Sequence, residues 1–474
     1  ADGILIERVA GALADAGLLV ARRGALPERA AAIPDDSRRV MPGSLFVAVR
    51  GSERDGHDFL TVAAGAGATC AIVEDESRST LPALIVRDGR RAAAVAAAEA
   101  FAHPMRSLSL VGVTGTNGKT TTVGILRHLL DEPRARAASV GTLGVLVGSD
   151  GAPVEGGGGL TTPGPIELQR VLRALVAAGV RTVAMEVSSH SLDQRRVEGA
   201  RFDAAIFTNL TRDHLDYHHT MEAYFEAKAA LVSLLTPAGA AVVNASDAAW
   251  RARPPAPRTI RFGVDDPAAD VVAAGVRYGA RGSEWTLDVG GSRASVTLPL
   301  IGDFNVANAL GAAAAAWSMG RELPVIAARL STVPQVPGRL EIIHDGPTVL
   351  RDYAHTPDAL ARALDAVRPF ARRRLIVVFG CGGDRDRGKR PLMGAIAEQG
   401  ADLAIVTSDN PRTEHPERII DEVVAGMTRG NHERVEDRRA AIARALDLAA
   451  TNDVIRLAGR GHETYQVRGT ERLP

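Results

Sequence analysis

The chain has 474 residues, of which 46% are hydrophobic and 24% charged, a balance typical of folded globular proteins. This length favours two to four domains over a single core. Lys and Arg together number 56, as do Asp and Glu, so the formal net charge is zero. This equality of positive and negative charges excludes the bulk positive charge of proteins that bind nucleic acids or anionic membranes. We therefore expect small-molecule partners that individual side chains and main-chain groups bind locally.

The two cysteines and the apolar segments indicate the compartment. Cys70 and Cys381 lie far apart in the chain and cannot build a disulfide framework or a Cys-rich metal site. No stretch reaches the roughly 20 apolar residues of a membrane span, and the Ala-rich run at 92–98 predicts a short helix instead. We therefore expect a cytoplasmic protein without a membrane span.

Breaker residues divide the chain into three blocks. His103-Pro104 closes an Ala-rich helix, and the Pro-rich stretch 333–338 predicts an interdomain hinge because proline ends regular elements. The expected domains are a small N-terminal α/β domain at 1–106, a central domain at 107–334 and a C-terminal domain at 335–474.

Short apolar runs that alternate with helix-period segments predict parallel sheets with crossover helices in the two larger blocks. In the central block the expected strands are 108–113, 182–187, 204–207 and 240–243, and the expected helices are 166–178 and 221–235. In the last block the expected strands are 374–379, 403–407 and 454–458, and the expected helices are 357–367, 391–399 and 419–427. The fold class is thus α/β, with a Rossmann-like C-terminal domain. Residues 254–300, rich in Pro and Gly, are expected to form an irregular β insertion.

The sharpest motif is a Gly- and Thr-rich loop that follows the first central strand and precedes a helix. Such a loop closes its backbone N–H groups around phosphate oxygens, while its lysine adds a charge and its threonine can hold Mg²⁺. Val113 stands where the strict pattern needs glycine, so the loop is a variant, and a plain turn is the alternative. The expected ATP-binding residues here are Gly115, Thr116, Asn117, Gly118, Lys119, Thr120 and Thr121.

With this loop, the sequence resembles the Mur ligases, whose loop carries Gly-Thr-x-Gly-Lys-Thr. Further matching motifs follow in the family's order and span nearly the whole chain, which makes the set far more specific than any single member. They are Asp36-Ser37-Arg38, Thr161-Thr162-Pro163, Glu186 to His190, Asn209 to Asp216, Phe225 to Lys228, Gly302 to Asn308, Asp352 to Pro357 and Gly380 to Arg385.

The resemblance implies an ATP-dependent amide ligase of peptidoglycan precursor synthesis. ATP would phosphorylate the D-glutamate side chain of UDP-N-acetylmuramoyl-L-alanyl-D-glutamate, and an amine would then attack the acyl phosphate. Asp409-Asn410-Pro411-Arg412 resembles the signature of the branch that adds meso-diaminopimelate. Because two anions meet in the first step, Mg²⁺ and cationic groups must neutralise charge.

The same resemblance gives the catalytic set, which is Lys119, Glu186, His214 and Lys228. Thr120, Glu186 and His214 are the implied metal ligands, and Lys228 matches a lysine that the family carbamylates to N6-carboxylysine. Taken alone, Glu186 could be a surface carboxylate, His214 a turn cap, and Lys228 a solvated helix lysine.

The remaining contacts are also implied by matching positions. For the nucleotide these are Asn305, Arg339, Asp352 and His355, although Asn305 could instead be the N-cap of a helix at 306–319. For the uridine nucleotide and muramoyl dipeptide the implied contacts are Ser37, Ser52, Glu53, Arg54, Thr161, Thr162, Ser188, Gln194 and Arg196. Among them, the forked guanidinium of Arg196 suits a carboxylate or a diphosphate.

Selection of diaminopimelate over lysine needs a fixed cation for the second carboxylate, and Arg412 matches it. Its alternative is a solvent-exposed arginine after a turn. The implied amino-acid pocket contains Arg385, Asp409, Asn410, Pro411, Arg412, Gly459 and Glu463. The sequence departs from the family pattern at Arg460, where the family usually has lysine, but the positive charge is retained.

Three rival interpretations remain at this level: a lysine-adding ligase of the same family, a folylpolyglutamate synthase-like ligase, and a non-catalytic nucleotide-binding switch module. The Asp409 to Arg412 motif and the Asp36 to Arg38 motif argue against the folylpolyglutamate synthase. A switch module would leave Lys228 and Arg412 without a task. We expect a monomer whose domains close over the substrates.

Overall fold

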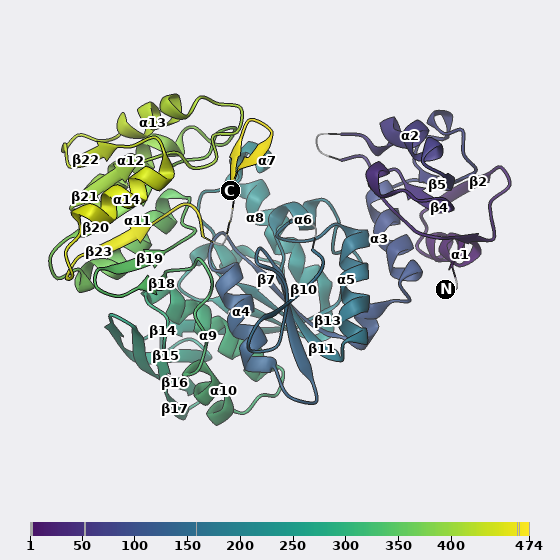
Figure 1. The fold of residues 1–474 in the computed structure, drawn as a ribbon. Coiled ribbons are helices and arrows are strands. Elements are labelled where there is room, and N and C mark those ends of the chain that lie inside the picture. Colours follow the sequence, from purple (N-terminus) through teal and green to yellow (C-terminus); the bar gives the residue numbers. More distant parts are fainter. Residues whose placement is uncertain (1–2, 52–53, 158, 462, 464, 474) are drawn as a thin grey trace.

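The computed structural model describes residues 3–51, 54–157, 159–461, 463 and 465–473. Three larger sheets follow one another along the chain, and each is flanked by helices, while two further sheets have only two strands each (Figure 1). This arrangement confirms the predicted α/β class with a large, mainly parallel central sheet.

The N-terminal part contains a four-stranded sheet in the order β2-β6-β5-β4. Helices α1 and α3 share a buried apolar cluster with this sheet, and Asp88 caps α3 by accepting a 3.0 Å hydrogen bond from the Arg91 N–H. The elements are β1 (Ile4–Leu5), α1 (Ile6–Asp15), β2 (Leu19–Arg23), β3 (Arg29–Ala30), β4 (Ser44–Val47), α2 (Leu60–Gly65), β5 (Ala68–Val73), β6 (Ala83–Val86) and α3 (Gly89–Ala100).

The central sheet has eleven strands in the order β10-β9-β8-β11-β7-β12-β13-β14-β15-β16-β17. Its middle is parallel from β8 to β15, and an antiparallel hairpin extends each end. The strands are β7 (Ser109–Thr114), β8 (Arg136–Gly141), β9 (Gly144–Val147), β10 (Ala152–Val154), β11 (Val180–Glu186), β12 (Phe202–Phe207), β13 (Leu235–Asn244), β14 (Arg258–Val264), β15 (Val271–Gly279), β16 (Gly282–Val289) and β17 (Ser292–Leu298).

Helices cover both faces of this sheet. Val111 of β7 joins the apolar cluster under α4, α9 and α10, whereas its neighbour Leu110 joins the cluster under α5, because successive strand residues point to opposite faces. The helices are α4 (Lys119–Leu130), α5 (Pro165–Ala177), α6 (Ser189–Asp193), α7 (Leu215–His218), α8 (Met221–Ala229), α9 (Asp303–Ser318) and α10 (Leu323–Leu330).

The C-terminal part has a six-stranded sheet in the order β18-β19-β23-β20-β21-β22, followed by the hairpin β24-β25. Apolar clusters lie on both of its faces, as expected for a doubly wound domain. The elements are β18 (Glu341–His344), β19 (Thr348–Arg351), α11 (Pro357–Val367), β20 (Leu375–Phe379), α12 (Lys389–Gly400), β21 (Leu403–Val406), α13 (Pro416–Val424), β22 (His432–Arg434), α14 (Arg438–Leu448), β23 (Val454–Leu457), β24 (Gln466–Arg468) and β25 (Glu471–Leu473).

Two expectations need correction. Residues 254–300 contain β structure, as expected, but form no irregular insertion, because β14 to β17 extend the central sheet with one register shift between Ala274 and Arg277. The signal was present in β16, where Trp285, Leu287 and Val289 alternate with less buried residues. The helix expected at 221–235 ends at Ala229 and continues as a 3₁₀ helix, Ala230–Leu234.

Two other expectations concern thiols and membranes. Cys70 and Cys381 are free and buried. Across the described ranges, no helix combines the length and the apolar character that crossing a bilayer requires.

Candidate active site

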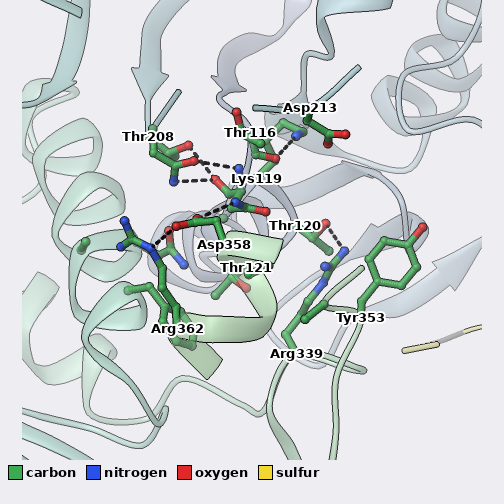
Figure 2. Close-up of a pocket in the computed structure, with 18 of the residues that line it drawn as sticks. Thr116, Lys119, Thr120, Thr121, Thr208, Asp213, Arg339, Tyr353, Asp358 and Arg362 are labelled. Atoms are coloured by element: carbon green, nitrogen blue, oxygen red, sulfur yellow. Dashed lines mark hydrogen bonds and ion pairs between the residues drawn. The ribbon is translucent and has the colours of Figure 1, made fainter. Parts of the chain in front are cut away.

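A cavity of about 460 Å³ lies where the central part of the chain meets the C-terminal part. Residues of the Gly-rich loop, with Thr208 after β12, face residues of α11 and of the segment before it across the cavity (Figure 2). The carboxyl ends of parallel strands meet at such an edge, which is where α/β folds bind nucleotides.

The Gly-rich loop connects β7 to α4 in the predicted order of strand, loop and helix. Gly115 and Gly118 have φ values of 145° and 89°, and a Cβ atom at either would collide with Thr208 or Asn308. The loop is also tied to the end of β12, since the Thr208 hydroxyl donates to the Asn117 oxygen at 2.7 Å. The loop is therefore held open at the N-terminus of a helix, a site suited to an anion.

The side chain of Lys119 folds back on this loop. Its Nζ donates hydrogen bonds of 2.9 Å to the main-chain oxygens of Gly115 and Thr116. Burial lowers the pKa of Lys119, and the carboxylates of Glu186 and Asp213 partly oppose this. An arriving phosphate would offer this ammonium a charged partner in place of two neutral oxygens.

The three implied metal ligands all line the cavity. The Thr120 hydroxyl accepts a 2.8 Å hydrogen bond from Arg339, and each oxygen of Glu186 accepts one from Thr142, at 2.9 and 3.2 Å. Glu186 ends β11 and is only 1% exposed, so the alternative of a surface carboxylate is wrong.

His214 stands at the N-cap position of α7 with φ 54°, but its side chain makes no capping hydrogen bond. Its Nε2 lies 3.4 Å from an Asp213 oxygen, and burial lowers the pKa of His214, which favours a neutral imidazole able to accept a metal. Within the described residues, no group of three or more His, Cys, Asp or Glu side chains could enclose a metal ion. A hydroxyl, a carboxylate and an imidazole fit an Mg²⁺ ion that takes its other ligands from phosphate and water.

Lys228 lies behind the Gly-rich loop and is 1% exposed. Its Nζ donates a 2.8 Å hydrogen bond to the Gly115 oxygen and lies 4.5 Å from the centre of the Tyr224 ring. Burial, with Lys119 nearby, places the pKa of Lys228 well below its usual range. The alternative of a solvated helix lysine is therefore wrong, although Lys228 does not itself line the cavity.

Among the implied nucleotide contacts, Arg339, Asp352 and His355 line the cavity and Asn305 does not. Asn305 is no N-cap, because α9 begins at Asp303, and its Nδ2 donates to the Ile301 oxygen at 2.8 Å. Asn308 reaches the cavity instead and donates to Asn305 Oδ1 at 3.2 Å. The prediction missed Asn308, although its spacing of three residues from Asn305 on a helix was a usable signal.

Several further residues in the cavity wall were not predicted. They come from the end of β8, from the segment before α7 and from α11, and they include Thr142, Asp213, Asp358 and Arg362. Asp213 lies in the matching motif Asn209 to Asp216 but was given no role, whereas Thr142, Asp358 and Arg362 are single polar residues outside the matching motifs.

The implied dipeptide contacts of the central part are brought together beside Glu186. The Thr162 hydroxyl donates to the main-chain oxygen of Glu186 at 2.8 Å and accepts from the Ser188 N–H at 3.1 Å. Arg196 donates to the Thr162 oxygen at 2.9 Å and, with two nitrogens, to Gln194 at 3.0 and 2.7 Å. Thr161 lines the cavity.

The implied uridine contacts lie in the N-terminal part, apart from the cavity. Ser37 starts a 3₁₀ helix, Ser37–Arg39, that Asp36 caps. Neither Ser37 nor Arg54 lines the cavity, whereas Ser52 and Glu53 lie outside the described residues.

The implied amino-acid contacts gather at the carboxyl ends of β20, β21 and β23 and do not line the cavity. Arg412, with φ 51°, donates to the Gly383 oxygen at 2.7 Å, and Asn410 accepts from the Val467 N–H at 2.8 Å. A Cβ at Gly459 would lie 2.8 Å from Asp409 Oδ2. The set also includes Arg385, Pro411 and Glu463, and Glu463 lies 3.8 Å from Arg460.

Electrostatics distinguish this amino-acid cluster from an ordinary surface. Burial lowers the pKa of Arg412, as does the nearby Arg385. Arg412 is half-buried, so the alternative of a solvent-exposed arginine is wrong. No carboxylate of the described chain lies within ion-pair distance of its guanidinium, which can therefore accept an anionic ligand.

Comparison with known proteins shows to which family the chain belongs. Sequence models described as the Mur ligase family catalytic domain, the Mur ligase middle domain and the Mur ligase glutamate ligase domain match residues 32–107, 113–316 and 338–461. The chain is 45% identical over 454 residues to the UDP-N-acetylmuramoyl-L-alanyl-D-glutamate--2,6-diaminopimelate ligase of Gloeobacter violaceus, covering 94% of this chain and 91% of that protein. The chain belongs to the Mur ligase family.

Solved structures resemble this Mur ligase along most of its length. A structure of a UDP-N-acetylmuramoyl-L-alanyl-D-glutamate--2,6-diaminopimelate ligase has a TM-score of 0.65 and 33% identity, covering 94% of this chain and 92% of that one. The MurF ligase of Thermotoga maritima in complex with ADP has a TM-score of 0.64 at 21% identity, covering 91% of this chain and 94% of that one, and shows the shared fold.

Proposed function

We propose that this Mur ligase uses ATP to join meso-diaminopimelate to UDP-N-acetylmuramoyl-L-alanyl-D-glutamate. The main observation in support is the half-buried guanidinium of Arg412, which has no carboxylate partner in the described chain and lies beside Arg385. Such a cation suits the second carboxylate of diaminopimelate, which lysine lacks. The curated relative with 45% identity carries the matching name.

The proposed reaction has two steps. A carboxylate oxygen of the D-glutamate attacks the γ-phosphorus of ATP, forming an acyl phosphate as ADP leaves. The amine of diaminopimelate then attacks the acyl carbon, so that an amide bond forms and inorganic phosphate leaves with the electrons of the broken C–O bond. Catalysis requires positioning and charge neutralisation more than covalent chemistry by the protein.

Protein groups around the cavity support the first step. Lys119 and the N–H groups of residues 115–121 would bind the phosphates, while Arg339, Asp352 and His355 would hold the rest of the nucleotide. Asn305 would contribute from behind the cavity wall, where it accepts a hydrogen bond from Asn308. Thr120, Glu186 and His214 would hold Mg²⁺, which when bound neutralises charge between the triphosphate and the carboxylate.

Lys228 is proposed to carry a carbamate. Lowering the pKa of a lysine favours its neutral amine, and a neutral amine can add CO₂ and release a proton to become an anionic carbamate. Its position behind Gly115 places that negative charge beside Lys119.

The other substrates would bind on either side of the cavity. Ser37, Ser52, Glu53 and Arg54 are proposed for the uridine nucleotide, and Thr161, Thr162, Ser188, Gln194 and Arg196 for the muramoyl dipeptide. The proposed diaminopimelate pocket consists of Arg385, Asp409, Asn410, Pro411, Arg412, Gly459 and Glu463.

We further propose that the chain acts in the cytoplasm as a monomer with domains at 1–106, 107–334 and 335–474. ATP and UDP-linked substrates are cytoplasmic metabolites, and the two buried free thiols suit a reducing compartment.

The deciding experiment supplies the UDP-linked dipeptide, ATP and Mg²⁺ and compares phosphate release with diaminopimelate and with lysine. Release with diaminopimelate alone, together with a new peptide bond seen by mass spectrometry, is expected. Equal release with lysine would favour the lysine-adding alternative, whereas ATP hydrolysis without any product would favour a nucleotide switch.

A further inference from the structure

Arg390 is a fully buried cation outside both candidate pockets. It lies in the first turn of α12 and its side chain is 0% exposed. Its two terminal nitrogens bind two carboxylates, Glu414 at 2.7 and 2.9 Å and Glu422 at 2.7 Å. The proposed reaction assigns no task to any of these three residues.

Glu414 connects this cation to the loops that carry the amino-acid cluster. One of its oxygens accepts a 2.6 Å hydrogen bond from the Asp384 N–H, while Arg390 itself donates to the Gly382 oxygen at 3.1 Å. The Arg390–Glu414 pair therefore bonds twice to the segment 382–384, which follows β20. Glu414 in turn lies two residues after Arg412 on the segment that follows β21.

The two segments are also bonded directly to each other. The Gly383 N–H donates to the Asn410 oxygen at 2.9 Å, and Arg412 returns a hydrogen bond from its guanidinium to the Gly383 oxygen at 2.7 Å. A carboxylate oxygen of Asp384 accepts from the Thr413 hydroxyl at 2.7 Å. The direction of the Arg412 side chain thus depends on where residue 383 lies.

The hydrogen bonds by which Arg390 and Glu414 hold the two segments together should be sensitive to substitution of either residue. One buried guanidinium serves two carboxylates, so losing the Arg390 charge would leave Glu414 without its cation, whereas Glu414→Gln leaves Arg390 paired with Glu422. Lysine keeps the charge but cannot bond to both oxygens of Glu414 in the planar fork that arginine forms. A substitution can therefore loosen the loops without removing the ion pair.

We propose that Arg390 is a positioning residue for amino-acid selection: with Glu414 it fixes segments 382–385 and 410–414 together and so directs Arg412 toward the incoming amino acid. This inference rests on the proposed function, since it names how the diaminopimelate pocket is held. Arg390 touches no substrate itself and acts through Glu414 and Gly382.

The test compares Arg390→Lys and Glu414→Gln with Arg387→Ala in the full chain. Arg387 also pairs with Glu422 but is 57% exposed, and its side-chain hydrogen bonds go to Glu422 rather than to segment 382–384, so it is a matched control. The KM for diaminopimelate should rise about tenfold or more in the first two variants, since a displacement of about 1 Å in a binding group can cost about 100-fold. The KM for ATP should stay within about twofold, because the Gly-rich loop lies in another part of the fold.

A second measurement needs no turnover. Amide hydrogen exchange of the substrate-free protein should be faster at residues 380–386 and 409–414 in Arg390→Lys and Glu414→Gln, and unchanged at 113–122. A protein that fails to ligate diaminopimelate would overturn the proposed function, while the exchange pattern would still report whether Arg390 fixes the loops.

Two results would overturn the positioning role. One is unchanged exchange in both segments together with an unchanged KM for diaminopimelate. The other is an equal rise in the KM values for ATP and diaminopimelate, which a general loss of structure would produce. If Arg390→Lys does not fold, Glu414→Gln decides alone, because it keeps Arg390 bonded to Glu422 and Gly382.

Discussion

The Nζ of Lys228 donates a 2.8 Å hydrogen bond to the main-chain oxygen of Gly115, 113 residues earlier in the sequence. The same oxygen accepts a hydrogen bond from Lys119 at 2.9 Å. Two lysines therefore converge on one carbonyl behind the phosphate loop, and burial lowers the pKa of both. Converting one of them into an anion would remove the repulsion between them.

The first prediction concerns a carbamate on Lys228. The chain has three lysines, Lys119, Lys228 and Lys389, so a carbamate signal from ¹³C-labelled bicarbonate can be assigned by substitution. The signal should be present in the wild type and in Lys389→Arg and absent in Lys228→Met. The rate of ligation by Lys228→Met should fall about 100-fold, which is typical for loss of one preorganised electrostatic group. Full activity of that variant would contradict the assignment.

The second prediction concerns the Gly-rich loop. In Gly118→Ala a Cβ would meet the Asn308 side chain at a residue with φ 89°, so the loop must shift and ATP binding should weaken about tenfold or more. Gly144→Ala is the matched control, because Gly144 also has positive φ but no atom lies within 4 Å of its Cβ position. Calorimetric titration with ATP distinguishes the two, and equal affinities would contradict the prediction.

The third prediction concerns Arg412. Arg412→Lys should raise the KM for diaminopimelate far more than the KM for ATP, by about tenfold or more, because lysine cannot present a planar fork to a carboxylate. Steady-state phosphate release at varied concentrations of each substrate measures both values. Equal changes in the two KM values would show that Arg412 lies outside the amino-acid pocket.

The fourth prediction concerns Arg339, which bridges the two halves of the cavity. It donates to Thr120 at 2.8 Å and lies over the Tyr353 ring at 4.5 Å. Arg339→Ala should raise the KM for ATP and leave the KM for diaminopimelate within about twofold, because distant sites act nearly independently. A larger effect on diaminopimelate than on ATP would contradict this placement.

The fifth prediction is a pH dependence of stability. Hydrogen bonding to Arg390 is the main cause that lowers the pKa of Glu414 from 4.5 to about 2. Because the folded-state pKa is the lower one, this stabilisation is fully present above pH 4.5 and is lost as the pH falls toward 2. The unfolding midpoint of Glu414→Gln should therefore vary less with pH in that window than the midpoint of the wild type. Parallel curves would contradict the link.

Local patterns in the sequence determined much of the architecture. The helix predicted at 357–367 coincides with α11 (Pro357–Val367), because a threonine cap, a proline at the first position and an amphipathic period are all local signals. The strand, loop and helix around residues 109–130 were predictable for the same reason. The assignment to the Mur ligases also came from short motifs in a fixed order.

Only the tertiary structure decided which side chains from distant parts of the chain contact the residues of those motifs. Taken alone, Lys228 indicates a solvated helix lysine, but α8 packs it behind Gly115. Arg390 belongs to none of the matching motifs, and its role follows only from the packing of α12 against the segments after β20 and β21. Burial and partner choice are non-local properties, set by contacts between residues that are far apart in the chain. The sequence by itself therefore determined many of the elements and the family, whereas packing decided the burial of Lys228 and Arg390 and the partners that each one binds.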